Sequence, residues 1–240
     1  MTIFFRLVLL MILILSSCSS NNLQQVTKLS NSRSSPTNNE DWSYTGNTGP
    51  SYWSSLNKDY ALCSSGKKQS PINIDQAIKK PIAFGINYHS SKFKVVKEKY
   101  TIKLIPLSRT NSITIQGNNY YLTQFHIHAP SEHTMKGQHS DLEMHFVHKN
   151  IHQSTAAIGV FVNSGKLNKE FQKIINLNPL ISQNDEKDLI VNLNIQAFIP
   201  YTSKIIRYEG SITTPPCTEG VIWIVFNKPI QFSTKQVYFY

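Results

Sequence analysis

Acidic side chains are scarce in this sequence: 14 Asp and Glu residues stand against 24 Lys and Arg residues, and the formal net charge is +10. Such an excess of positive charge can attract nucleic acids, anionic membranes or small anions. A nucleic-acid-binding protein gathers its basic residues on one face and interleaves them with aromatic side chains, whereas here Lys and Arg are scattered along the chain. We therefore expect no nucleic-acid partner, and a basic surface in contact with solvent is the simplest interpretation.

The sequence also lacks a hydrophobic run long enough to cross a bilayer. The apolar run Leu7–Leu15 has nine residues, whereas a membrane-spanning helix needs about 20. The run follows Arg6 and ends in Leu15-Ser16-Ser17-Cys18, a pattern typical of a bacterial lipoprotein export signal. We predict a signal peptide at residues 1–17, cleavage before Cys18 and lipidation of that cysteine. Ordinary signal cleavage at the small residues, without a lipid, remains the alternative.

Residues 18–40 contain almost nothing to bury. They are rich in Ser, Asn, Gln and Thr, a composition that favours a flexible tether between an anchor and a folded domain. Ser19, directly after Cys18, resembles the sorting residue of outer-membrane lipoproteins in Gram-negative bacteria. We expect an exported, periplasmic protein that is attached to the outer membrane through the lipid on Cys18.

The remaining residues, 41–240, are enough for one domain of about 200 residues with a sizeable core. Short alternating runs between residues 92 and 121, with a turn at Gly117-Asn118-Asn119, predict antiparallel strands. We predict further strands at residues 156–162, 198–208 and 221–226. Helical spacing of Leu167, Phe171, Ile174 and Ile175 predicts a surface helix over residues 165–178. The fold class is therefore mainly β with peripheral helices.

Histidines are concentrated in one stretch of this domain. Seven of the eight lie between His126 and His152, and such a density indicates a metal site. Successive side chains of a strand point to opposite faces, so Gln124, His126 and His128 share one face, and Glu143, His145 and Val147 share another. If the two strands pair in antiparallel fashion, three imidazoles converge.

Three histidines that leave a fourth position open are typical of catalytic zinc. Gln124 and Glu143 each precede a histidine by two residues on the same face, where they can hold the ring nitrogen that does not bind the metal. An exposed His-rich surface that binds metal loosely is the alternative. It explains the number of histidines but neither the strand parity nor the paired polar residues.

Several motifs resemble the alpha-class carbonic anhydrases. They are Gln124-Phe125-His126-x-His128, Ser131-Glu132-His133-Thr134, Glu143-x-His145-x-Val147-His148, and Ser211-Ile212-Thr213-Thr214-Pro215-Pro216-Cys217-Thr218-Glu219-Gly220-Val221 followed by Trp223. The resemblance runs from about Trp42 to Gln231. It implies one domain with a large central, mostly antiparallel twisted β-sheet and peripheral short helices. It also implies reversible hydration of carbon dioxide to bicarbonate and a proton by a zinc-bound hydroxide, and inhibition by anions and sulfonamides.

The resemblance also assigns roles to individual residues. The zinc ligands are His126, His128 and His145. The catalytic residues are Thr213, Glu132 and Thr214, with Thr213 donating to the carboxylate of Glu132 and accepting from the hydroxide. The carbon dioxide pocket is formed by Val147, Ala157, Ile212, Val221 and Trp223. Tyr44 borders the active site, and His133 and His148 occupy hydrogen-bonded positions that do not bind metal.

Cys18 serves the anchor, which leaves Cys63 and Cys217 as an even pair in an oxidising compartment. The resemblance to bacterial members implies a disulfide between them that holds the Thr213-Thr214 segment. Two buried free thiols are the alternative.

The sequence departs from the family at two places. Fast members carry a proton-shuttle histidine where this chain has Tyr100, and a tyrosine with a pKa of about 10 is a poorer relay near neutral pH than a histidine at about 6.5. Family members also continue for some dozens of residues past the position of Gln231, so we expect a C-terminal portion of the domain to be missing. A catalytically weak or inactive carbonic-anhydrase-like surface lipoprotein is therefore the alternative function, although all three zinc histidines are present.

Overall fold

The computed structural model describes residues 42–76, 82–177, 189–201 and 203–240. The predicted signal peptide, the lipidated Cys18 and the tether lie outside the described residues. Within the described part of the chain, no helix is long and apolar enough to cross a membrane.

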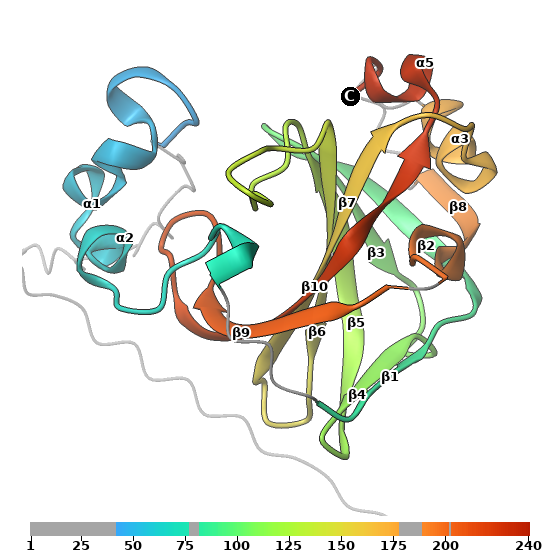
Figure 1. The fold of residues 1–240 in the computed structure, drawn as a ribbon, viewed down its shortest axis with the longest axis horizontal. Coiled ribbons are helices and arrows are strands. Elements are labelled where there is room, and N and C mark those ends of the chain that lie inside the picture. The colour runs from blue at the N-terminus through green and yellow to red at the C-terminus, as the bar shows by residue number, and fades with distance from the viewer. Residues whose placement is uncertain (1–41, 77–81, 178–188, 202) are drawn as a thin grey trace, which may run out of the picture. The chain divides into compact units, whose positions relative to one another are not determined.

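The domain is built on one mixed sheet of ten strands, which confirms the predicted fold class (Figure 1). The path through the sheet runs β8-β2-β3-β5-β6-β7-β10-β9, and β4 joins β1 to β5 beside it. All pairs are antiparallel except the parallel pair of β7 and β10. The strands are β1 (Phe84–Asn87), β2 (Ser90–Lys97), β3 (Ile102–Pro106), β4 (Ser112–Ile115), β5 (Asn118–His128), β6 (Leu142–Lys149), β7 (Thr155–Ser164), β8 (Leu189–Asn194), β9 (Ile205–Ser211) and β10 (Glu219–Phe232).

The helices of the described part are short and lie around the sheet (Figure 1). They are the α-helices α1 (Trp53–Leu56), α2 (Leu62–Ser65), α3 (Lys169–Ile175) and α5 (Thr234–Val237), and the 3-10 helices η1 (Gly46–Thr48), η2 (Pro50–Tyr52), η3 (Lys58–Tyr60), η4 (Ile74–Gln76) and η5 (Ile195–Phe198).

Two predicted elements are wrong in extent. Helix α3 covers residues 169–175 rather than 165–178, because the side chain of Asn168 caps its start by accepting hydrogen bonds from the N–H groups of Glu170 and Phe171. Leu167 is therefore outside the helix and 56% exposed. The strand predicted at residues 198–208 begins only at Ile205, because Phe198 ends the 3-10 helix η5 and buries its ring in the core.

The hydrophobic core lies on the face of the sheet opposite the histidines. Phe125 and Ile127 of β5 and Met144 and Phe146 of β6 are at most 1% exposed and belong to the main apolar cluster. Because side chains alternate along a strand, burying these four residues directs the intervening polar side chains to the other face. Burial of these four apolar residues therefore sets the histidines on the face of the sheet that carries the site.

A disulfide joins Cys63 to Cys217 across 154 residues of sequence. It adjoins a cluster of buried and half-buried aromatic side chains that includes Trp42, Trp53 and Tyr100. The bond therefore fastens the N-terminal helices to the segment that carries Thr213 and Thr214.

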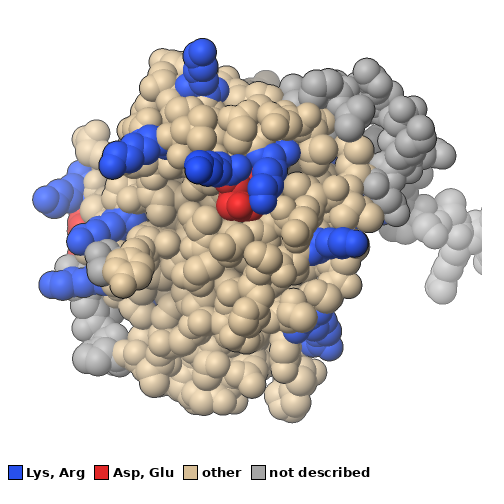
Figure 2. Space-filling model, turned by 90° about the vertical axis from the view of Figure 1, so that its right-hand side faces the viewer, with Lys and Arg blue, Asp and Glu red and all other residues tan. Residues whose placement is uncertain are grey.

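Figure 2 views the side of the domain that carries α3, β8 and β2. Lys and Arg side chains are spread over this face, with acidic side chains in few places. On this face the basic side chains are separated by stretches of other residues.

Candidate metal centre and active-site cavity

The backbone register of β5 and β6 brings three histidines together. His126 lies directly opposite His145, and His128 lies opposite Glu143. The ring centroid of His128 lies 4.8 Å from the ring centroid of His126 and 4.6 Å from that of His145. One nitrogen of each ring lies within 4.8 Å of the others. The antiparallel pairing and strand parity expected from the sequence thus produce the convergence.

The polar contacts of the His126 and His145 rings decide which nitrogens face one another. His126 Nδ1 lies 2.8 Å from Gln124 Oε1, and His145 Nε2 lies 3.1 Å from Glu143 Oε1. Each of these nitrogens faces an acceptor oxygen and is the one suited to carry hydrogen, although the His145 contact lacks hydrogen-bond geometry. The lone pairs of His126 Nε2 and His145 Nδ1 are then free.

His128 contributes the observation that tests whether a metal fits. Its Nε2 atom is buried and has no hydrogen-bond partner among the described residues. A buried polar atom without a partner is destabilising, and a metal ion shared with the two other free nitrogens would satisfy it. Neutral imidazole nitrogens suit zinc, so the donor set fits that ion.

The electrostatic surroundings keep two of these rings neutral. Burial lowers the pKa of His126 well below its ordinary value, and the neighbouring rings of His128 and His145 lower it further. Burial and His145 act in the same direction on the pKa of His128. Burial also lowers the pKa of His145, but the carboxylate of Glu143 outweighs it, so that pKa stands above its ordinary value.

Glu143 is completely buried and holds two histidines at once. Besides facing His145, it accepts hydrogen bonds from the backbone N–H of His133 at 2.8 Å and from His133 Nδ1 at 2.7 Å. Burial alone would raise the pKa of Glu143, but His133 and His145 outweigh burial and hold the pKa well below its usual range. Glu143 is therefore an anion that accepts hydrogen bonds at neutral pH.

The ligand atoms of His133, Glu143 and His145 also lie within 4.8 Å of one another, but His133 and Glu143 already hydrogen-bond to each other. His133 Nε2 accepts from the hydroxyl of Tyr208 at 2.6 Å, and that hydroxyl lies 2.8 Å from Ser70 Oγ. This chain of hydrogen bonds supports His145 from behind, as expected of His133. The sequence interpretation missed Tyr208 because its contact with His133 joins residues far apart in the chain.

Gly159 makes room for this network. It lies on β7 directly opposite His145, and a Cβ atom at Gly159 would come within 2.8 Å of Glu143 Oε1. A single glycine inside the apolar run of residues 156–162 was the available signal, since such a glycine often marks a close approach within a sheet.

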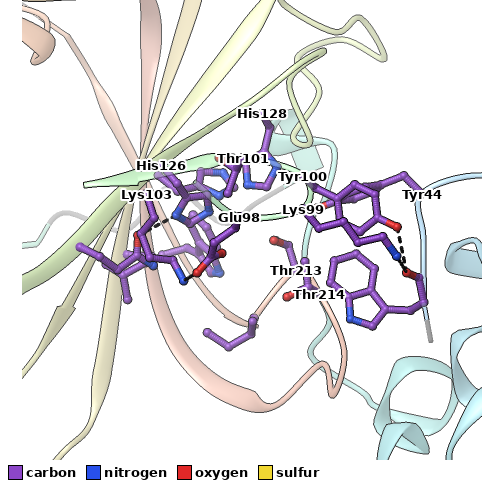
Figure 3. A pocket seen from close by; sticks show the side chains of 17 residues that line it. Tyr44, Glu98, Lys99, Tyr100, Thr101, Lys103, His126, His128, Thr213 and Thr214 are labelled. Carbon is purple, nitrogen blue, oxygen red and sulfur yellow. Dashed lines mark hydrogen bonds and ion pairs between the residues drawn. The ribbon is translucent and has the colours of Figure 1, made fainter. Parts of the chain in front are cut away.

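A cavity of about 310 Å³ opens above the three histidines (Figure 3). One wall is apolar and is formed by Val147, Ala157, Trp223 and Ile212. The first three are in register across β6, β7 and β10. Val221, which the resemblance also places in this wall, does not line the cavity; it is buried in the apolar cluster behind Ala157 and Trp223.

Glu132, Thr213 and Tyr44 meet beside the histidines. Glu132 Oε1 lies 3.4 Å from His128 Nδ1 and 3.5 Å from the hydroxyl of Tyr44. Burial raises the pKa of Glu132, while His145 and the hydroxyl of Thr213 oppose that shift. Thr213 and Thr214 both line the cavity, with their side chains facing the histidines in Figure 3.

The mouth of the cavity is polar. The Tyr100 hydroxyl donates to the carbonyl oxygen of Trp42 at 3.0 Å, and Lys103 forms an ion pair with Glu98. Both pairs are drawn in Figure 3. The sequence interpretation did not identify Lys103 and Glu98 as cavity residues, because they belong to no motif; the turn between β2 and β3 brings them together.

A sequence model of the eukaryotic-type carbonic anhydrase family matches residues 48–239. The carbonic anhydrase of Klebsiella pneumoniae is 36% identical over 198 residues, which are 82% of this chain and 80% of that protein. This chain belongs to the alpha-class carbonic anhydrases. The carbonic anhydrase of Neisseria gonorrhoeae is also 36% identical, over 79% of this chain and 75% of that protein.

Solved carbonic anhydrases share the fold. The alpha-carbonic anhydrase of Thermovibrio ammonificans, determined with the inhibitor sulfanilamide, superposes with a TM-score of 0.75 at 37% identity, covering 82% of this chain and 88% of that one. The chain is accordingly an enzyme of the carbonic anhydrase class.

Proposed function

We propose that this carbonic anhydrase binds one zinc ion through His126 Nε2, His128 Nε2 and His145 Nδ1 and catalyses the reversible hydration of carbon dioxide. The observation that carries the proposal is the meeting of three free imidazole nitrogens, one of them buried and unpartnered, at the base of a cavity with an apolar wall. Zinc held by three histidines lowers the pKa of a coordinated water to about 7, as is established for carbonic anhydrases as a class, and so supplies the nucleophile.

Gln124 and Glu143 hold the zinc histidines in place. Each lies against the ring nitrogen that would not bind the zinc, and this contact favours one tautomer and one ring orientation. The negative charge of Glu143 makes His145 a more basic ligand.

Thr213 and Glu132 orient the nucleophile. An ionised carboxylate can only accept a hydrogen bond, so the hydroxyl of Thr213, which acts on the pKa of Glu132, would donate to that carboxylate. The oxygen of Thr213 is then free to accept a hydrogen bond from the nucleophile. This hydrogen bond would orient the nucleophile so that its reactive lone pair faces the carbon dioxide. Thr214 completes this side of the cavity.

Carbon dioxide has no net charge or dipole, and an apolar surface suits it better than a charged clamp. The wall of Val147, Ala157 and Trp223 offers such a surface on the strands that neighbour the histidines. The bicarbonate product is an anion, so it prefers water and the polar mouth of the cavity to the apolar wall.

The experiment is to measure the zinc content of the purified protein and to follow carbon dioxide hydration by stopped flow, with sulfanilamide as the inhibitor. We expect one zinc per chain and sulfanilamide-sensitive hydration, both lost in His145→Ala. His152→Ala is the matched control, because His152 is exposed and lies in the turn between β6 and β7. A folded, zinc-loaded protein without hydration would favour the alternative, a non-catalytic binding protein.

We further propose that the protein is exported and anchored to the outer membrane through a lipid on Cys18, as the first 18 residues of the sequence suggest. The test is fractionation of cells that express the full chain or Cys18→Ala. The unmodified protein should sediment with outer membranes, and Cys18→Ala should lose that association. Equal release of both proteins into the soluble periplasm would contradict lipidation.

A further inference from the structure

β4 pairs with β5 over residues 118–121, but the half of β5 that carries two of the zinc histidines is weakly paired on one side. β5 pairs with β6 along most of its length, but its backbone register with β3 includes only Leu104 opposite Phe125. Ile127 lies between His126 and His128, beyond that position. Its contacts with β3 therefore help to decide how steadily both histidines are held.

Two hydroxyl groups join the strands at this point. The hydroxyl of Tyr240 accepts a hydrogen bond from the backbone N–H of Ile102 at 3.2 Å and donates to the carbonyl oxygen of Ile127 at 2.8 Å. The hydroxyl of Thr101 lies 2.6 Å from that of Tyr240, and it contacts both the N–H group and the carbonyl oxygen of Ile127. The two side chains thus replace the backbone ladder where it is interrupted.

Every polar group in this arrangement has at least one partner. With Tyr240 donating to Ile127, the hydroxyl hydrogen of Thr101 can go to Ile127 or to the oxygen of Tyr240, and the Ile127 N–H donates to Thr101. Burial raises the pKa of Tyr240, so the phenol keeps its hydrogen at physiological pH. Thr101 also lines the active-site cavity beside His126 and His128 (Figure 3), which connects the two hydroxyls to the site.

We propose that Tyr240 is a positioning residue for the metal centre, whose hydroxyl ties β3 to the backbone between His126 and His128. The inference rests on the proposed function, since it assumes that these histidines bind zinc. Loss of the hydroxyl alone should let the segment around Ile127 move, while the ring of Tyr240 still packs against the core.

The test compares Tyr240→Phe with the unmodified protein, and Tyr238→Phe is the matched control. Tyr238 is two residues away and 85% exposed, so its hydroxyl should not matter. Three quantities are measured: the affinity for zinc by competition with a chelator, the amide hydrogen exchange of Ile102, and the separate values of kcat and KM.

We expect Tyr240→Phe to bind zinc about three- to tenfold more weakly, as fits the loss of one hydrogen bond. The Ile102 amide should lose protection, and kcat should fall with little change in KM, because the carbon dioxide wall is untouched. Tyr238→Phe should match the unmodified protein in all three.

Thr101 provides a second, independent pair of variants in case Tyr240→Phe does not fold. Thr101→Val should reproduce the weaker zinc binding, and Thr101→Ser, which keeps the hydroxyl, should restore it. Zinc affinity and kcat that stay unchanged in Tyr240→Phe and Thr101→Val overturn the inference alone. An unmodified, folded protein that takes up no zinc overturns the proposed function and this inference with it.

Discussion

The space beside Gly159 offers a sharp test of how Glu143 holds the proposed metal centre. In Gly159→Ala the new Cβ atom would lie 2.8 Å from Glu143 Oε1, closer than Cβ atoms are found to oxygen, and 3.4 Å from a methyl group of Val225. Glu143 is fully buried and is held by two hydrogen bonds from His133. The carboxylate must therefore move against its own partners by about 0.5 Å, a displacement large enough to disturb a preorganised site.

We expect two measurable consequences. Overpacking of this kind destabilises a protein by about 1–3 kcal/mol, which for a domain of this size lowers Tm by about 2–12 °C. Displacing the partner of a metal-binding histidine typically weakens metal binding by about 10–100-fold, and under our proposal the contact between Glu143 and His145 is such a partnership. Thermal unfolding of the metal-free protein gives the first quantity, and zinc competition with a chelator gives the second.

Gly85→Ala is the matched control. Gly85 also lies in a strand, but the nearest atom to its added Cβ would be Thr114 Cβ at 4.0 Å. That variant should be neutral or slightly more stable, because alanine restricts the unfolded chain. If Gly159→Ala unfolds and binds zinc like Gly85→Ala, the close approach does not constrain Glu143 and our account of His145 is wrong.

Three further predictions concern pH, proton transfer and the disulfide. Burial lowers the pKa of His148 to about 3 in the folded protein, whereas in the unfolded chain this histidine takes up its proton at about pH 6.5. The free energy of unfolding should therefore be constant above pH 6.5 and fall as the pH drops, by about 2–3 kcal/mol at pH 4.5. Urea unfolding at pH 7 and 4.5 should show a smaller loss in His148→Gln. Turnover should depend on the concentration of small buffers and become less dependent in Tyr100→His; equal stopped-flow rates at low and saturating buffer would contradict this. Replacing Cys63 and Cys217 by serine should cost about 2–5 kcal/mol in denaturant unfolding, with lower hydration because the Thr213 segment loosens; unchanged stability would count against the bond.

The sequence by itself determined which way the histidines and their polar neighbours face. Alternation along an extended strand is a local property of the backbone, so Gln124, His126 and His128 could be assigned to one face without knowledge of any partner strand. The apolar residues between them, Phe125 and Ile127, made that assignment firm because they must be buried. The family motifs then supplied Thr213 and Glu132, which no periodicity would have joined.

Only the tertiary structure decided how these residues meet. The register that sets His126 opposite His145, the closeness of Gly159 to Glu143 and the reach of Tyr240 to Ile127 join positions that are distant in the chain. Such contacts depend on how strands pair and how tightly the core packs. Neither strand pairing nor core packing is written in the local pattern of side chains.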